Sequence, residues 1–410
     1  MRRLFLSVLL LCLAASPALA QSAKVERQFR DWLAGDLWPE AAKKGISRST
    51  FDAAFDGVTL NWKLPDLVPP GSKATTPKKQ HQAEFGAPSR YFKAGIVQGA
   101  TAGGRRLKKQ LASTLARIEG AYGVPGRILL AIWGRESGYG RAKIPYNVFE
   151  VLGTKAFMST RKDLFRTELL AALEMAQKGM ATPARMKGSW AGAMGQPQFM
   201  PSSYLKHAAD GDGDGHADIW GSQADTLASI ANYLRHYGWQ TGRDWGFEVV
   251  VPDEVSCALE GPDRGKPIAR WAAMGIRRVN GKAFPDHELK GEGYLMMPSG
   301  RLGPAFIVTP NFYVLKEYNE SDLYALFVGH VGDRIEWNVG DFTQSWGKVD
   351  RLYRSDIARM QRAMEKKGYD VGGADGLPGY KTRRSIGDWQ AKNGRRPTCF
   401  PDAGLVKAIR

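Results

Sequence analysis

Cysteine is scarce in this 410-residue sequence, which contains three: Cys12, Cys257 and Cys399. The last two lie far apart and lack the spacing of a metal site, so no cysteine-based metal centre is expected. In an oxidising compartment they could form a bridge between domains, and two unpaired buried thiols fit the sequence equally well. The sequence also lacks a long apolar run after its first 20 residues, so no membrane span is predicted.

The first 20 residues have the pattern of a secretory signal peptide. Arg2 and Arg3 precede an apolar run over residues 4–15, and Ala18-Leu19-Ala20 is typical of a cleavage site. Leu11 before Cys12 is too large for a lipoprotein site. We therefore expect a soluble periplasmic protein whose mature chain begins at Gln21.

Acidic residues are fewer than basic ones, 41 against 58, and the net charge is +17. A basic exported protein usually meets an anionic polymer or surface, and outside the cytoplasm nucleic acid is not the expected partner. Solubility alone would also explain the charge. The composition, 43% hydrophobic and 24% charged, is that of a globular protein with one large domain and a small one.

The stretch 125–140, PGRILLAIWGRESGYG, predicts one short apolar helix. Proline suits its first position, and Gly138 and Gly140 mark its end. Four residues share i, i+3, i+4, i+7 spacing and hence the buried stripe: Leu129, Ile132, Trp133 and Glu136.

Glu136 is thus placed where a helix normally carries a core side chain. Burial and the negative end of the helix dipole both raise the pKa of such a carboxyl, toward the range useful to a general acid. A structural glutamate paired with Arg135 or Arg141 fits the spacing equally well.

Residues 187–204, KGSWAGAMGQPQFMPSSY, show no period and combine glycines with polar and aromatic residues. This composition is typical of a loop folded close to a ligand. Ser189 and Gln198 could hydrogen-bond a sugar hydroxyl or acetamido group. A tight structural turn would explain the glycines alone.

Residues 210–221, DGDGDGHADIWG, carry oxygen ligands at the EF-hand positions one, three and five, as Asp210, Asp212 and Asp214. His216 stands at position seven, where the backbone carbonyl is the ligand. Position twelve is glycine, so Asp225 is the expected replacement for the usual glutamate. A structural calcium ion is predicted, because three close carboxylates repel one another without a cation; an aspartate-rich turn without metal is the alternative.

The rest of the sequence predicts mainly helix, with a small inserted sheet. Period-two runs occur at 245–251 and 305–309, and Ser321 precedes a helix. Residues 64–88 predict a loop or tether, and 336–348 a connection to a small helical C-terminal unit. Three tyrosines, Tyr233, Tyr318 and Tyr324, could stack on sugar rings, although a core tyrosine is the commoner situation.

Four ordered motifs resemble the B-type lytic murein transglycosylases of the lysozyme-like superfamily. They are Glu136-Ser137-x-x-Gly140, the Gly188–Gly195 segment, the Gln198–Tyr204 segment and the calcium-like loop. The resemblance implies an α+β, mainly helical lysozyme-like catalytic domain over residues 21–345 with the calcium loop at 210–225. It also implies cleavage of the β-1,4 bond between N-acetylmuramic acid and N-acetylglucosamine of peptidoglycan, which leaves 1,6-anhydro ends.

By the same resemblance Glu136 is the only catalytic acid and base, and no organic cofactor is needed. Five residues match sugar-contacting positions: Ser189, Gln198, Tyr233, Tyr318 and Tyr324. Residues 350–410 look like a three-helix peptidoglycan-binding domain. The competing functions are a hydrolytic muramidase, which needs a second base, and a non-catalytic wall-binding scaffold.

Overall fold

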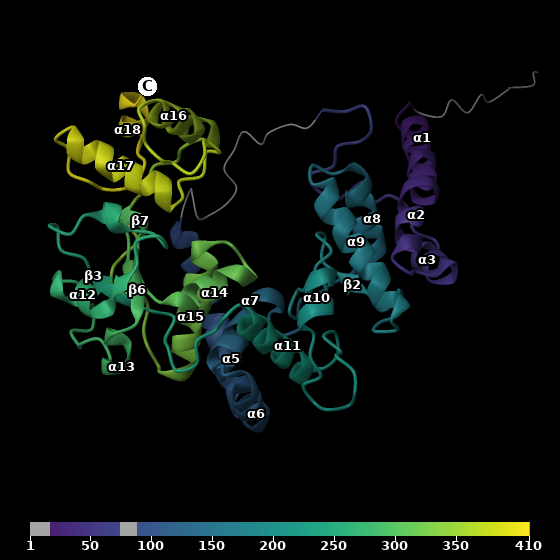
Figure 1. The fold of residues 1–410 in the computed structure, drawn as a ribbon, viewed down its shortest axis with the longest axis horizontal. Coiled ribbons are helices and arrows are strands. Elements are labelled where there is room, and N and C mark those ends of the chain that lie inside the picture. The colour runs from purple at the N-terminus through teal and green to yellow at the C-terminus, as the bar shows by residue number, and fades with distance from the viewer. Residues whose placement is uncertain (1–16, 74–87, 410) are drawn as a thin grey trace, which may run out of the picture. The chain divides into compact units, whose positions relative to one another are not determined.

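The computed structural model describes residues 17–73 and 88–409. Most of the predicted signal peptide, residues 1–20, and part of the 64–88 segment lie outside them. The chain divides into two units, the first made of Met1–Ala74, Ile144–Met194 and Phe199–Leu205, the second of Thr75–Lys143, Gly195–Gln198 and Lys206–Arg410 (Figure 1).

The first unit is helical and closes around aromatic side chains. Ser47 caps α3 as a helix start should, because its hydroxyl accepts the Thr50 backbone N–H. Phe29 packs on Phe157, and Phe51 on Phe55. The elements of this unit are α1 (Pro17–Trp32), a π-helical turn (Leu33–Leu37), α2 (Trp38–Lys43), α3 (Arg48–Phe55), β1 (Tyr146–Asn147), α8 (Val148–Met158), α9 (Lys162–Gln177) and β2 (Lys187–Gly188). The helix α10 (Pro201–His207) begins in this unit at a proline, a residue that suits the first position of a helix.

The second unit has a helical part built around α7 (Gly126–Ser137), which packs against α5 and α15. Its residues from Ile128 to Trp133 are fully buried, as the apolar sequence requires. The other helical elements of this part are a short 3-10 helix (Pro88–Phe92), α5 (Ala94–Gln110), α6 (Ala112–Tyr122), α11 (Gln223–His236), α14 (Pro310–Tyr318) and α15 (Asp322–Glu336).

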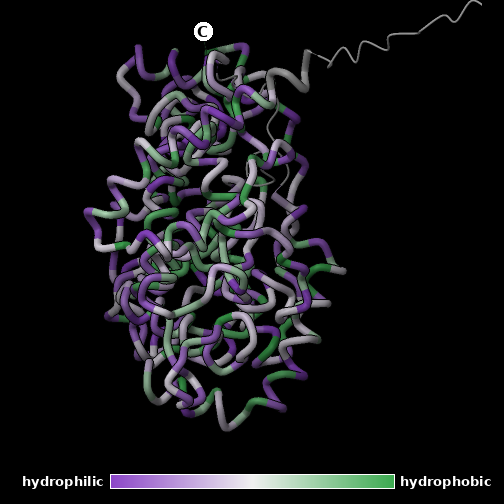
Figure 2. Tube along the Cα trace, turned by 90° about the vertical axis from the view of Figure 1, so that its right-hand side faces the viewer, coloured by the Kyte–Doolittle hydropathy of each residue, from purple (hydrophilic) through white to green (hydrophobic). Residues whose placement is uncertain are grey.

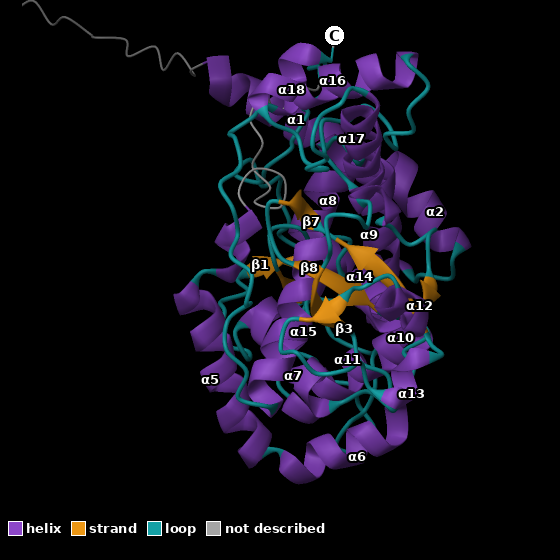
Figure 3. Ribbon diagram, turned by 90° about the vertical axis from the view of Figure 1, so that its left-hand side faces the viewer, coloured by secondary structure: helices purple, strands orange, loops and turns teal. Residues whose placement is uncertain are grey.

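The predicted inserted sheet is confirmed, and Figure 3 shows its strands among the helices. The strand order is β4-β6-β8-β3-β5 with antiparallel neighbours, and Val249 of β3 faces Ala305 of β8. The two predicted runs form β3 (Gly246–Val250) and β8 (Ala305–Val308). Around them lie η3 (Cys257–Leu259), β4 (Lys266–Pro267), α12 (Ile268–Ala273), β5 (Arg277–Arg278), α13 (Asp286–Leu289), β6 (Glu292–Met296) and β7 (Pro298–Arg301).

The C-terminal residues form three helices, α16 (Arg354–Lys366), α17 (Tyr380–Lys392) and α18 (Ala403–Ala408). They enclose a small apolar core that includes Met360, Ile386 and Leu405. A disulfide joins Cys257 of η3 to Cys399, so the two cysteines are bridged rather than free. Both cysteines belong to the second unit, and the bridge fixes the C-terminal helices to the sheet region.

Among the described residues no helix is both long and apolar enough to cross a membrane. Figure 2 shows hydrophilic and hydrophobic residues mixed along the described trace.

Candidate active site

The helix α7 presents Glu136 in its last turn. Pro125 is the N-cap, one position before the helix rather than its first residue as expected, and Gly138 ends the helix in the left-handed conformation with φ 58°. Glycine adopts this conformation without steric cost, so the sequence stops the helix directly after the glutamate.

Two further glycines allow neighbouring side chains to approach the helix end. A Cβ on Gly134 would lie 2.6 Å from the Tyr139 ring, and one on Gly140 would lie 2.3 Å from Gln196 Oε1. The tyrosine hydroxyl donates a hydrogen bond to the Ala100 carbonyl oxygen. Packing therefore requires both glycines, and Gly140 also has a φ of 77°, which favours glycine.

The Glu136 carboxyl is partly buried and accepts a hydrogen bond from the Tyr324 hydroxyl, with 2.5 Å between the oxygens. Burial raises the pKa of Glu136 to about 7, although the Tyr324 hydrogen bond and the Arg135 charge both act to lower it. The carboxyl can thus carry a proton near neutral pH and release it without leaving its place.

Neither candidate arginine forms an ion pair with Glu136 in the described part of the chain. The Arg135 guanidinium lies over the rings of Tyr91 and Phe327, 4.5 and 5.1 Å from their centroids. Arg141 donates to the Gly138 carbonyl oxygen. The glutamate therefore faces a tyrosine, and a structural salt bridge does not explain its burial.

Three tyrosines extend from Glu136 in a row. The ring of Tyr324 stacks on that of Tyr318 with centroids 6.3 Å apart, and Tyr318 contacts Tyr233 at 4.9 Å. Tyr318 donates to the Pro197 carbonyl oxygen and Tyr233 to that of Glu317, each at 2.6 Å. The structure thus brings together the catalytic candidate and the three tyrosines chosen from the sequence.

Gln198 belongs to the second unit, and its backbone has a φ of 55°. Its side-chain amide donates to the Gly195 carbonyl oxygen at 2.8 Å. Ser189 belongs to the first unit, where it begins a tight turn: its backbone N–H donates to Ala193 and its carbonyl accepts from Gly192. The glycines of this segment therefore serve a turn, and the hydroxyl of Ser189 remains half-buried.

Gln196 is a residue that the sequence did not single out. Its Oε1 accepts the Trp133 indole N–H at 2.9 Å, and its Nε2 donates to the Trp220 carbonyl oxygen at 3.1 Å. It therefore ties the helix that carries Glu136 to the end of the aspartate-rich loop. The sequence placed Gln196 within a motif, but an amide in a glycine-rich loop gives no sign of which neighbours it will bridge.

The predicted calcium loop gathers Asp210, Asp212 and Asp214, each with a carboxylate oxygen within 4.8 Å of the others. All three are exposed, and among the described residues none forms an ion pair with lysine or arginine. Gly213 and Gly215 adopt φ angles of 85° and 89°, which let the loop curl around these oxygens. Hard oxygen donors in such a loop fit a calcium ion.

Asp225 and His216 lie differently from the three aspartates. Asp225 is buried, and its oxygens accept the backbone N–H groups of Gly211 and Asp218, each at 2.7 Å. These two hydrogen bonds hold the loop, and Asp225 lies outside the group of three close carboxylates. His216 is exposed, and its backbone N–H donates to Asp214.

The comparisons with known proteins agree with this fold. The family model described as transglycosylase SLT domain matches residues 28–333. Membrane-bound lytic murein transglycosylase B of Escherichia coli is 32% identical over 266 residues, which cover 64% of this chain and 71% of that protein.

Two solved structures are also similar to this chain. SltB3 of Pseudomonas aeruginosa, solved in complex with NAG-anhNAM-pentapeptide, has 35% identity and a TM-score of 0.82, over 93% of this chain and 99% of that chain. Slt35 of Escherichia coli, solved in complex with calcium, has 30% identity and a TM-score of 0.51, over 62% of this chain and 80% of that chain.

A lysozyme-like helical fold that carries a glutamate of raised pKa at the end of a buried helix is typical of enzymes that cut cell-wall glycan. Within that class, the chain belongs to the SLT transglycosylase family and is a B-type lytic transglycosylase that acts on peptidoglycan.

Proposed function

We propose that this enzyme cleaves the β-1,4 bond between N-acetylmuramic acid and N-acetylglucosamine, with Glu136 as its only catalytic acid and base, and leaves 1,6-anhydromuramic acid ends. The observation that carries the proposal is the Glu136 carboxyl, whose pKa burial raises to about 7 beside the Tyr324 hydroxyl. A single carboxyl that holds and releases a proton near neutral pH can first donate a proton to the leaving oxygen and then accept one from the sugar.

In the first step Glu136 gives its proton to the glycosidic oxygen as the bond to C1 breaks. The carboxylate left behind is stabilised by the Tyr324 hydroxyl, because a hydrogen bond to an ionised oxygen is stronger than one to a neutral carboxyl. In the second step the carboxylate removes the proton of the C6 hydroxyl, whose oxygen bonds to C1. The enzyme regains its proton and no water is consumed.

A hydrolase of the usual kind needs a second carboxylate near the first. The other described carboxyl whose pKa burial raises to about 7 is that of Asp333. Its oxygens accept from the Arg127 guanidinium at 2.5 Å and from the Trp245 indole at 3.0 Å, so it is engaged in a buried structural pair. It also lies nine residues after Tyr324 on α15, about 13 Å along the helix.

The substrate contacts that we infer are Ser189, Gln198, Tyr233, Tyr318 and Tyr324. The place of the tyrosine row beside Glu136 supports this assignment, although Tyr324 and Tyr233 are themselves buried. The NAG-anhNAM-pentapeptide bound by the similar SltB3 is a ligand of the same kind.

We also infer that the loop 210–225 binds a structural calcium ion. Asp210, Asp212 and Asp214 would supply carboxylate oxygens, and His216 its backbone carbonyl. Asp225 stays a proposed ligand, and its carboxylate also holds the loop through two backbone N–H groups. The ion would add stability and take no part in the reaction, and the similar Slt35 was solved with calcium. No organic cofactor is expected.

Residues 350–410 are proposed to bind peptidoglycan, since they have a small core of their own beside an enzyme for that polymer. Tethering would raise the substrate concentration near Glu136. We further propose that residues 1–20 direct export and that the enzyme works in the periplasm.

The experiment compares Glu136→Gln with Glu320→Gln, a change of an exposed glutamate in the same unit. Purified murein is digested and the released fragments are measured. The Glu136 variant should fold and bind murein, while turnover falls by at least a thousandfold, because the amide cannot donate a carboxylic proton. The Glu320 variant should match the unmodified enzyme. Undiminished release by the Glu136 variant would favour a wall-binding scaffold or another catalytic group.

A further inference from the structure

Asp322, the first residue of α15, links three helices through its side chain. Its Oδ1 accepts from the Lys316 ammonium of α14 at 2.7 Å, and its Oδ2 accepts from the Arg383 guanidinium of α17 at 3.4 Å. Burial acts to raise the pKa of Asp322, but the Lys316 and Arg383 charges outweigh it and hold the pKa below its usual range. The carboxyl is therefore ionised and held by two cations.

Lys316 and Asp322 each lie close in sequence to a tyrosine of the row beside the catalytic glutamate. Tyr318 lies two residues after Lys316, and Tyr324 lies two residues after Asp322. The two tyrosine rings stack on one another with planes 6° apart. The ion pair between Lys316 and Asp322 thus joins the end of α14, which carries Tyr318, to the start of α15, which carries Tyr324.

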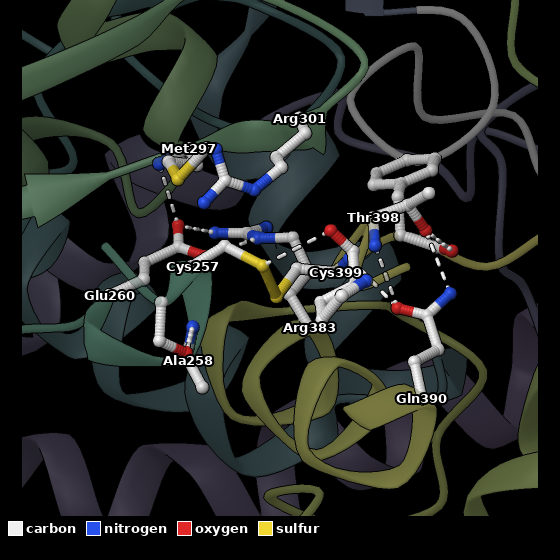
Figure 4. The surroundings of a disulfide bond; sticks show 12 residues. Cys257, Ala258, Glu260, Met297, Arg301, Arg383, Gln390, Thr398 and Cys399 are labelled. Carbon is white, nitrogen blue, oxygen red and sulfur yellow. Dashed lines mark hydrogen bonds and ion pairs between the residues drawn. A yellow bond between two sulfur atoms is a disulfide. The ribbon is translucent and has the colours of Figure 1, made fainter. Parts of the chain in front are cut away.

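Arg383 comes to this pair from the C-terminal helices and is itself rigidly held. Its side chain is 2% exposed, and it donates to both carboxylate oxygens of Glu260 at 3.0 and 2.5 Å (Figure 4). It also donates to the Pro378 carbonyl oxygen at 3.1 Å. Glu260 also accepts the Met297 backbone N–H at 2.9 Å. These contacts use three of the five N–H groups of the guanidinium, and the Nη2 that donates to Glu260 also reaches Asp322 of α15.

The disulfide lies beside this arginine. Glu260 directly follows η3, which contains Cys257, and Figure 4 shows the bridge between Glu260 and Gln390. A Cβ on Gly387 of α17 would lie 2.2 Å from Cys399 Sγ, so the helix is packed directly on the bridge. The bridge therefore fixes the helix from which Arg383 projects.

We propose that Arg383 is a positioning residue for catalysis, which acts through Asp322 to hold Tyr324 on Glu136. The C-terminal helices are then a part of the catalytic scaffold in addition to any glycan binding. This inference rests on the proposed role of Glu136. The C-terminal helices would then help to position the catalytic residues, a role that a simple tether does not have.

The first test is the variant Asp322→Asn in the full-length enzyme, with kcat and KM measured on soluble murein glycan fragments across pH. The matched control is Arg396→Met, which removes an exposed ion pair between the same tail and Asp253. We expect kcat to fall about tenfold for Asp322→Asn with KM within about twofold, because substrate contacts remain. The control should leave both constants unchanged.

The pH profile separates positioning from mere stability. The groups that face Glu136 are Tyr324 and Tyr318 from other helices and Arg135 from its own. Because the Tyr324 hydrogen bond lowers the pKa of Glu136, loosening it should move the alkaline limb of kcat to higher pH. A lower melting temperature with an unmoved alkaline limb would overturn the proposal.

A double-mutant comparison tests whether Asp322 acts on Glu136 through the Tyr324 hydroxyl. If the effect passes through the Tyr324 hydroxyl, Asp322→Asn should change kcat less than twofold in a Tyr324→Phe background. A full tenfold loss in that background would contradict the route. In either case anhydro products from the unmodified enzyme would show that the proposed function stands independently.

A second variant tests Arg383 itself. Arg383→Met alone would leave Glu260 buried without a partner, which strongly destabilises a fold, so Arg383→Met is combined with Glu260→Gln. This double variant should show the same displaced alkaline limb as Asp322→Asn. An unmoved limb in a folded double variant would exclude Arg383 as the positioning group.

Discussion

The Tyr324 hydroxyl donates a hydrogen bond of 2.5 Å to the Glu136 carboxyl, and this contact links two helices that are far apart in the sequence. Burial alone would keep Glu136 protonated, while the tyrosine favours the ionised form. The two influences oppose one another and leave the pKa near the working pH, where proton donation and proton removal are both efficient.

Replacing Tyr324 by phenylalanine should lower kcat about tenfold, because the carboxylate formed in the first step loses its donor. The pKa of Glu136 should rise, since a group that lowers it is gone. The alkaline limb of the kcat profile should therefore move to higher pH. An unchanged profile would show that this hydroxyl does not act on Glu136.

Glu136→Gln should stabilise the fold at alkaline pH. The folded-state pKa of about 7 lies above the ordinary value of 4.5, so as pH rises between them the unfolded chain loses a proton that the folded chain retains. The free energy of unfolding therefore falls over this range, by roughly 3 kcal/mol in total. The Glu136→Gln variant escapes this loss, because the amide of glutamine does not titrate.

Melting temperatures of Glu136→Gln and the unmodified enzyme test this. They should coincide below pH 4.5 and differ by a few degrees at pH 8, with the variant higher. Glu320→Gln is the control for the loss of one carboxyl. A variant that is less stable at pH 8 would contradict the burial of this group.

Calcium should raise the melting temperature, because an ion that binds only the folded loop shifts the equilibrium toward folding. Excess chelator should remove the increase, and Asp214→Asn should abolish the response to either addition. The matched control is Asp375→Asn, an exposed aspartate of another glycine-rich loop. A melting temperature that does not change when calcium is added would count against a calcium site in the loop 210–225.

Loss of the disulfide should destabilise the second unit. The bridged cysteines are 142 residues apart, so Cys257→Ser with Cys399→Ser restores considerable freedom to the unfolded chain. We expect a loss of about 2–5 kcal/mol in stability. Thermal unfolding with and without reductant measures it, and the double variant should no longer respond to reductant.

Local patterns in the sequence predicted much of this structure. The apolar period around Glu136, the helix start at Ser321 and the two strands of the sheet all follow from neighbouring residues, and each is confirmed. The raised pKa of Glu136 was also predictable, since it depends mainly on which helix face is buried.

Contacts between distant segments were not predictable in this way. Sequence spacing could not decide whether Cys257 and Cys399 form a bridge, nor show that Gln196 joins the catalytic helix to the loop. Nor could spacing show that the buried Asp225, expected to be a calcium ligand, accepts backbone N–H groups with both oxygens. Such pairings depend on the folded chain as a whole.

The most direct test of the central claim is digestion of murein in water enriched in heavy oxygen, followed by mass analysis of the new glycan ends. Because the C6 hydroxyl is proposed to replace water, the muramic acid ends should be anhydro forms without the label. Reducing ends that carry heavy oxygen would show that water reaches C1, and the claim that Glu136 closes the sugar on itself would fail.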